Sequence, residues 1–167
     1  MPDIKRLDRD EWETLRHLRL TALADSPDAF LATYAKEDQY DPAQWRAEFD
    51  RGAWYVYEDD DGSVGLIGAT REPQMPFDEC YLEFIWVPRE RRGTGMAFDL
   101  VESVLKLLRA DQFRIAYLWV LDGNEAAMGL YKKLGFVSTD ERHTLKDRPG
   151  RTEERFMLDL HAGPGPI

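Results

Sequence analysis

The chain has 167 residues, which is enough for one domain with a substantial hydrophobic core. Its 43% hydrophobic and 32% charged residues are ordinary for a soluble globular protein, and no apolar run approaches the length of a membrane span. The formal net charge of −10 argues against a broad nucleic-acid surface. It would attract a cationic partner over long range, or it serves solubility alone.

The cysteine content and the N-terminal residues bear on location. A single cysteine, Cys80, excludes a disulfide within the chain and fits a reducing compartment. Residues 3–8 are too charged for the apolar core of a signal peptide. We therefore expect a cytoplasmic protein with neither a membrane nor a nucleic acid as partner.

The chain is predicted to begin with a strand and a helix. Residues 3–7 are the strand candidate, and Asp8 or Asp10 can cap a helix that continues to residue 24. The Ser26-Pro27 dipeptide is expected to end this helix, because the residue before a proline is disfavoured in helical conformation.

A second helix and a hairpin follow. Residues 42–51 read as a helix with Asp41 as its cap, after a polar stretch without a clear period. Residues 53–58 and 63–70 are predicted to pair as a hairpin around the acidic tip at 59–62. An Asp-Gly pair favours turn chemistry at this tip over a metal site.

The central stretch is a strand, a basic glycine-containing turn and a helix. Residues 80–87 alternate with both faces largely apolar, which predicts a strand covered on both sides. Pro88 ends this strand, and residues 97–110 place apolar side chains at helical spacing.

The C-terminal part is predicted to complete the sheet. Residues 114–120 read as a buried strand, and Asn124 can cap a helix over residues 125–134. Residues 136–143 and 154–160 are expected to form a closing antiparallel pair.

The turn Arg92-Gly93-Thr94-Gly95-Met96-Ala97 has the composition of an anion site. The first N–H groups of a helix lack internal partners, glycines allow a ligand to approach the backbone, and arginines add positive charge. The alternative is an ordinary strand-to-helix turn with solvated arginines. A P-loop is excluded because no Lys-Ser or Lys-Thr follows the glycines, and a dinucleotide fingerprint because Phe98 replaces its third small residue.

These six residues resemble the Arg/Gln-x-x-Gly-x-Gly/Ala signature of the GNAT superfamily of N-acetyltransferases, which holds the pyrophosphate of acetyl-coenzyme A. A second pattern resembles that family's second signature, with a strand, an Asn at a helix start, an Ala, a Leu-Tyr pair and a closing Gly-Phe. In this chain it comprises Leu118-Trp119-Val120, Asn124, Ala127, Leu130-Tyr131 and Leu134-Gly135-Phe136. The two motifs occur in the family's order.

The resemblance implies an α/β (α+β) fold, with a twisted, mixed, mostly antiparallel sheet flanked by helices. We expect one such domain over residues 1–162 and a flexible tail at 163–167. The implied activity is that of an acyltransferase that moves acetyl from acetyl-CoA directly to a primary amine, without a metal. A small-molecule acceptor, with the option of a cationic one, is favoured, and a homodimer is compatible with the resemblance. The alternatives are a protein or peptide N-acetyltransferase and a non-catalytic CoA-binding interaction module.

The resemblance also suggests roles for single residues. Tyr131 matches the tyrosine that many relatives place near the coenzyme sulfur as a proton donor, and the alternative is a tyrosine packed against the sheet. Ile85, Trp86 and Val87 match the region where relatives splay the strand at a bulge and pair with the pantetheine arm. Asn124 matches a pantetheine contact, although a helix cap would explain it fully.

Glu83 is the candidate general base, acting through water. It lies within a predicted strand among apolar residues, where a carboxylate is costly unless it serves a site or finds partners. An ion-paired or edge glutamate is the alternative. Weaker candidates for the base are Tyr81, Asp28, Glu37 and Asp38.

Overall fold

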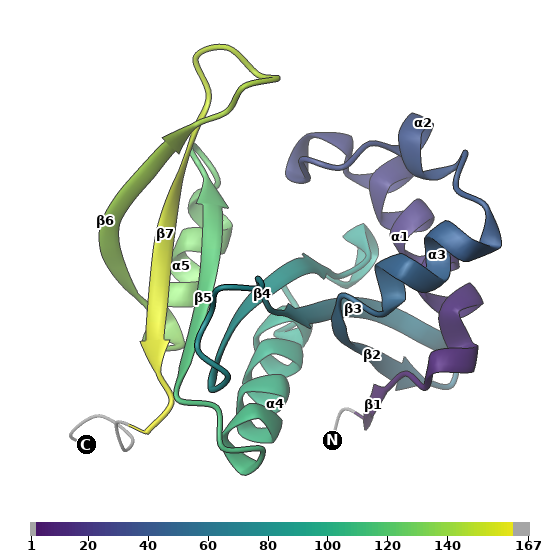
Figure 1. Cartoon of the computed structure of the whole chain (residues 1–167), viewed down its shortest axis with the longest axis horizontal. Coiled ribbons are helices and arrows are strands. Elements are labelled where there is room, and N and C mark those ends of the chain that lie inside the picture. The colour runs from purple at the N-terminus through teal and green to yellow at the C-terminus, as the bar shows by residue number, and fades with distance from the viewer. Residues whose placement is uncertain (1–2, 162–167) are drawn as a thin grey trace.

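A computed structural model describes residues 3–161, which form one seven-stranded sheet with helices on both of its faces (Figure 1). The strand order is β1-β2-β3-β4-β5-β7-β6. Every neighbouring pair is antiparallel except β4 and β5, which are parallel. The predicted mixed, mostly antiparallel α/β architecture is confirmed, whereas residue 162 and the predicted tail at 163–167 lie outside the described residues.

All seven predicted strands are present, with ends that shift by a few residues. They are β1 (Asp3–Arg6), β2 (Gly52–Asp59), β3 (Gly62–Thr70), β4 (Glu79–Trp86), β5 (Ile115–Leu121), β6 (Val137–Thr144) and β7 (Thr152–Asp159).

The four predicted helices are also present, and the structure adds a short one. They are α1 (Trp12–Asp25), α2 (Tyr34–Glu37), α3 (Pro42–Phe49), α4 (Met96–Ala110) and α5 (Glu125–Lys133). Helix α2 was not predicted, because its four residues are too few to show a helical period. Across residues 3–161 no helix combines the length and the apolar character that crossing a membrane demands.

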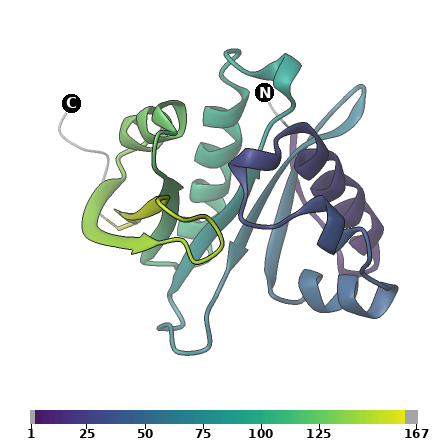
Figure 2. The same cartoon turned by 90° about the horizontal axis from the view of Figure 1, so that it is seen from above.

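The helices divide the hydrophobic core into two layers, and Figure 2 shows α4 and α1 on opposite sides of the sheet. On one face, Leu100 and Val104 of α4 pack with Ile67 of β3. On the other face, Leu15 of α1 packs with Trp54 of β2. Burial of such large side chains stabilises the sheet from both sides and fixes the position of β4 at its centre.

A bulge in β4 interrupts the middle of the sheet. Between the pairs Gly68–Glu83 and Leu66–Trp86, β3 advances by two residues and β4 by three, so β4 carries one extra residue. Phe84 lies there with a φ of 52°, which is unusual for an aromatic residue. The bulge implied by the family resemblance is thus confirmed.

The strands β4 and β5 are paired only from Glu79 to Tyr81 on β4, and they diverge after Tyr81, before the bulge is reached. The prediction that both faces of β4 are covered is wrong for its C-terminal half. Tyr81, Glu83 and Ile85 are only partly buried. Their side chains line cavities, so the apolar alternation reflects the wall of a site in addition to a packed core.

A buried ion pair joins α1 to α2. Two guanidinium nitrogens of Arg19 each lie 2.7 Å from a carboxylate oxygen of Glu37. The side chains of Arg19 and Glu37 are 6% and 3% exposed. A second carboxylate, that of Glu48, lies 3.4 Å from the same guanidinium. The pair orients the segment between the two helices, which includes Phe30.

We expect Glu37→Gln to lower the free energy of unfolding by about 3–5 kcal/mol, because it leaves the Arg19 charge buried beside a single carboxylate. Chemical denaturation would measure this change. The matched control is Asp50→Asn, which removes a bidentate but exposed ion pair with Arg9 and should cost less than about 1 kcal/mol. Equal losses in the two variants would contradict a special role for the buried pair.

Candidate active site

Most of the predicted site residues line a single cavity of about 630 Å³ beside the N-terminus of α4. Nine of them contribute to its wall: Ile85, Trp86, Val87, Arg92, Gly93, Gly95, Ala97, Asn124 and Tyr131. They come from β4, the turn before α4, and α5 with the turn that leads into it, so the fold brings together residues almost 50 positions apart. We call this hollow the turn cavity.

The two glycines of the turn adopt conformations that other residues avoid. Gly93 and Gly95 have φ angles of 77° and 88°, and a Cβ built on either would meet nothing within 4 Å. The backbone is therefore open to the cavity at these two positions. The N–H groups at the start of the 15-residue helix α4 follow immediately, as an anion site requires.

Two of the six turn residues, Thr94 and Met96, do not line the turn cavity. The Thr94 hydroxyl donates to the carbonyl of Arg91 at 2.5 Å, which holds the turn in shape. Met96 is buried in the core formed with α4. Both were predicted as binding residues, and the structure places neither side chain in the cavity wall.

Arg92 is held by the protein on three sides. Its guanidinium donates to the carbonyl of Val87 at 3.2 Å, to Asp25 at 3.1 Å and to the hydroxyl of Ser26 at 2.7 Å. The side chain thus ties the turn to the end of α1. Its charge still lies at the rim of the turn cavity, because the side chain is 45% exposed.

Asp25 is the centre of this connection and was missed by the sequence analysis. Its carboxylate accepts hydrogen bonds from Ser26 and from the indole of Trp86, and lies 3.6 Å from Arg89. The Ser26 hydroxyl, followed by Trp86, Arg92 and Arg89, lowers the pKa of Asp25 against the opposing effect of burial. The sequence signal was an acidic residue next to Ser-Pro, which indicates only a helix end.

Tyr131 is almost fully buried at the inner end of the turn cavity. It is 8% exposed, and its ring packs edge-on against Phe136 at 5.9 Å. Burial raises the pKa of its phenol, so the hydroxyl keeps its proton at neutral pH. Asn124 performs the capping role that was the alternative, since its side chain accepts from the backbone N–H of Ala127 at 3.2 Å.

A narrow neck of about 150 Å³ continues from Tyr131 between the diverging strands β4 and β5. It shares Tyr131 and Asn124 with the turn cavity, and Glu83 and Trp119 with a third hollow on the other side. Tyr131 and Glu83, the two predicted catalytic residues, are therefore brought to the same neck. This opening lies where β4 and β5 are no longer paired, because paired strands would leave no space between them.

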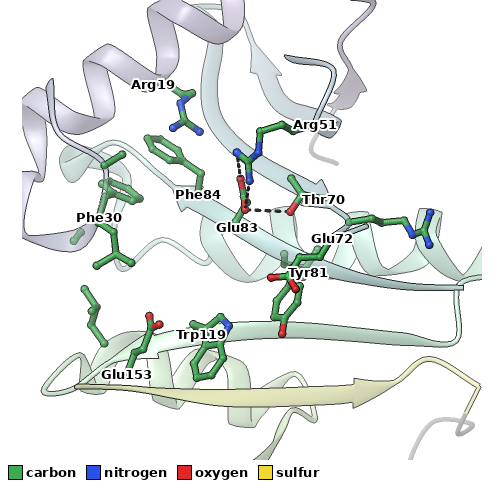
Figure 3. A pocket seen from close by; sticks show the side chains of 16 residues that line it. Arg19, Phe30, Arg51, Thr70, Glu72, Tyr81, Glu83, Phe84, Trp119 and Glu153 are labelled. Atoms are coloured by element: carbon green, nitrogen blue, oxygen red, sulfur yellow. Dashed lines mark hydrogen bonds and ion pairs between the residues drawn. The ribbon is translucent and has the colours of Figure 1, made fainter. Parts of the chain in front are cut away.

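The third hollow, which we call the outer cavity, has a volume of about 410 Å³ (Figure 3). Aromatic side chains contribute much of its wall. Phe30 stacks on Phe84 with ring centroids 4.3 Å apart, and Tyr81 and Trp119 line the wall formed by β4 and β5.

Glu83 is ion-paired, which was the alternative to its role as general base, and its side chain also lines the outer cavity. Its carboxylate lies 2.9 Å from Arg51 and accepts a hydrogen bond from Thr70 at 3.1 Å (Figure 3). Burial alone would lower the pKa of Arg51, but the charges and hydrogen bonds of Glu83 and Glu48 outweigh it and raise that pKa. The pair fixes the position of the Glu83 carboxylate beside the neck.

The weaker candidates for a base are less well placed. Glu37 is occupied by Arg19, and Asp38 lines a separate surface hollow beside α1. Asp28 lines the turn cavity. Tyr81 lines the outer cavity, where its hydroxyl accepts from Arg155 at 3.2 Å.

The acidic hairpin tip is engaged with the turn. Asp59 and Asp61 lie 2.5 Å and 2.9 Å from the guanidinium of Arg91. Within residues 3–161 no group of three or more histidines, cysteines and carboxylates has a metal-binding arrangement. Through these ion pairs the tip of the β2–β3 hairpin holds Arg91, which directly precedes the glycine turn.

Comparison with known proteins shows which family and which individual proteins this chain resembles. The sequence model of the family described as "Acetyltransferase (GNAT) family" matches residues 9–136. The chain is 32% identical over 90 residues to N-acetyltransferase 8B of Homo sapiens, covering 53% of this chain and 40% of that protein. It is 24% identical over 80 residues to the L-methionine sulfoximine/L-methionine sulfone acetyltransferase of Pseudomonas aeruginosa, covering 48% and 46%.

The chain thus spans less than half the length of these curated relatives. Among solved structures, yncA of Salmonella typhimurium, determined with its cofactor acetyl-CoA, superposes with a TM-score of 0.76 at 14% identity, covering 100% of this chain and 98% of that one. This likeness shows a shared fold.

Proposed function

The chain belongs to the acetyltransferase (GNAT) family, and from that premise we propose that it transfers acetyl from acetyl-CoA to a primary amine. The observation that carries the proposal is the junction of two cavities at a neck lined by both Tyr131 and Glu83. One cavity has an anion-binding turn for the coenzyme, and the other is open for an acceptor.

The turn cavity is the proposed acetyl-CoA site. The backbone at Gly93 and Gly95 and the first turn of α4 would bind the pyrophosphate. Residues 85–87 lie beyond the end of the β4–β5 ladder, so their backbone is placed to pair with the amides of the pantetheine arm. The thioester would then reach Tyr131 at the neck.

The proposed chemistry is a direct transfer in a ternary complex. The amine nitrogen, as free base, attacks the thioester carbon, and the C–S bond breaks as the C–N bond forms. Glu83 receives the amine proton through water, while the protonated phenol of Tyr131 supplies a proton to the departing thiolate.

Cys80 has no place in this chemistry. It is 1% exposed in the core, and burial raises the pKa of its thiol to about 12. A thiol in that state is a poor nucleophile. A reducing cytoplasm suits such a free thiol, and we propose that location.

A small molecule is the favoured acceptor. The outer cavity, at about 410 Å³, falls within the range of roughly 300–1,000 Å³ that is typical of small-ligand sites. Its aromatic wall and its three glutamates, Glu72, Glu83 and Glu153, would contact such a molecule on several sides. A small acceptor also agrees with the sulfoximine and sulfone substrates named for the Pseudomonas relative.

The coenzyme site is tested by Gly93→Asp with Gly93→Asn as its matched control. Both side chains tolerate the left-handed backbone, and a Cβ at this position meets no neighbour. Only Asp adds a negative charge beside the proposed pyrophosphate. Calorimetric titration with acetyl-CoA should show affinity at least about tenfold weaker for Gly93→Asp than for Gly93→Asn. Equal affinities would exclude an anion site at this turn.

Tyr131→Phe should lower kcat by roughly 100-fold, because the thiolate leaves without its proton donor. The affinity for acetyl-CoA should remain within about twofold, because the ring and its packing on Phe136 are retained. Steady-state kinetics and calorimetry measure the two quantities. The control is Tyr55→Phe, which alters another buried tyrosine in the core away from the neck. Full activity in Tyr131→Phe would remove the proton-donor role.

Glu83→Gln should lower kcat by roughly 100-fold, because glutamine cannot accept the amine proton. Glu48→Gln is the matched control, since Glu48 shares the Arg51 partner at 2.5 Å but does not line the cavity. Its kcat should stay within about threefold of the unmodified protein. Similar losses in both variants would show that the Arg51 network, and not the Glu83 carboxylate, matters for turnover.

A further inference from the structure

Two of the three glutamates of the outer cavity lie on facing walls and have different partners, whereas the third, Glu72, is exposed to solvent. Glu83 extends from β4 and Glu153 from β7, on the opposite side of the hollow (Figure 3). Glu83 has a guanidinium partner at 2.9 Å. Glu153 is 13% exposed at its side chain, and its ion-pair contact, with Nδ1 of His143, is 3.9 Å long.

The surroundings of Glu153 make the lack of a closer cation costly in free energy. The imidazole of His143 stacks on Trp119 with ring centres 4.2 Å apart, and its other nitrogen lies 3.4 Å from Glu141. Burial raises the pKa of Glu153, and the nearby imidazole only partly opposes this effect. A partly buried carboxylate without a close cation is stabilised when a ligand supplies one.

The two carboxylates also differ in their distance from the chemistry. Glu83 lines both the neck and the outer cavity, whereas Glu153 lines the outer cavity alone. An acceptor whose reacting nitrogen lies at Glu83 therefore extends away from Tyr131 toward Glu153. The apolar part of the cavity wall includes Trp119, Leu121 and Phe30, which could contact a spacer between the two ends.

The arginines of the same cavity are already engaged by the protein. Arg19 is bonded to Glu37, and Arg51 lies between Glu48 and Glu83. Arg71 donates to the backbone carbonyls of Glu79, Met75 and Pro76. An acceptor with a carboxylate would have to compete with the existing contacts of these guanidiniums. A cationic group could instead bind Glu153 without displacing an arginine.

We propose that the acceptor is a primary amine with a second cationic group at the far end of an apolar spacer, and that Glu153 binds this distal cation. The inference rests on the proposed acetyl transfer and adds the class of the substrate. The proximal nitrogen forms the new C–N bond as the C–S bond breaks, and its proton passes to Glu83 through water. The distal ammonium keeps its proton throughout and contributes only to binding.

The test compares α,ω-diamines of increasing chain length with monoamines of the same carbon number, using acetyl-CoA and the full chain. We expect the unmodified protein to favour the best diamine over its monoamine in kcat/KM by roughly 10- to 100-fold, as expected for a hydrogen-bonded charge pair. Glu153→Gln should abolish this preference, mainly through the KM of the diamine, while its affinity for acetyl-CoA in calorimetric titration stays within about twofold of the unmodified protein, because Glu153 does not line the turn cavity. Retained affinity for acetyl-CoA also shows that the variant folds.

Glu154→Gln is the matched control. It makes the same change one residue further along β7, where side chains alternate between faces and Glu154 pairs with Arg142 at 2.9 Å. Its diamine preference should equal that of the unmodified protein.

Three results would overturn the inference. They are equal use of diamines and monoamines, preference for an amino acid with a free carboxylate, and a diamine preference that survives Glu153→Gln. Each of these leaves acetyl transfer intact, so the proposed function stands. Binding of acetyl-CoA with no acetylation of any amine would instead overturn the proposed function, and the diamine inference with it.

Discussion

The extra residue in β4 is the constraint on which the rest of the site depends. It forces Phe84 into a left-handed backbone conformation, which costs roughly 1–2 kcal/mol for a residue with a side chain. The cost is offset by contacts, because the ring of Phe84 stacks on Phe30 and lies 4.2 Å from the Arg19 guanidinium. Just before the bulge, β4 separates from β5 after three paired residues, and the space between the two strands is the neck. The bulge and this separation together leave an opening in the sheet.

The segment after α1 connects the two sides of this opening. Asp25 at the end of α1 bonds Trp86 of β4 and Arg92 of the glycine turn, so it belongs to the coenzyme side. Phe30, five residues later, lines the outer cavity, and its carbonyl accepts a hydrogen bond from Arg148 in the β6–β7 loop. The buried pair of Arg19 and Glu37 fixes the other end of the segment. One short stretch of chain therefore contributes to the walls of both the turn cavity and the outer cavity.

The sequence was informative wherever local chemistry decides structure. Alternation, turn residues and strand propensity together predicted all seven strands, and the two glycines indicated an open turn because their positive φ angles suit few other residues. Local patterns predict less where an interaction joins distant segments. The pairing of Glu83 with Arg51 spans 32 residues and that of Asp25 with Arg92 spans 67, and neither leaves a local pattern. For the same reason the apolar faces of β4 were interpreted as covered strand, since a cavity wall and a packed core select similar side chains.

The position of Glu153 shows why charge must be considered pair by pair. A net charge of −10 describes the whole chain, and it does not distinguish a carboxylate held by an arginine from one without a close cation. In the outer cavity Arg51 pairs with Glu83 and fixes its carboxylate beside the neck, whereas Glu153 has only an imidazole 3.9 Å away. A fully paired cavity would bind a neutral spacer and gain little from a second charge. A partly buried carboxylate without a close cation would regain, when it binds a ligand cation, part of the free energy that its desolvation costs. The selectivity for a dication would therefore arise from the charge state of the empty site.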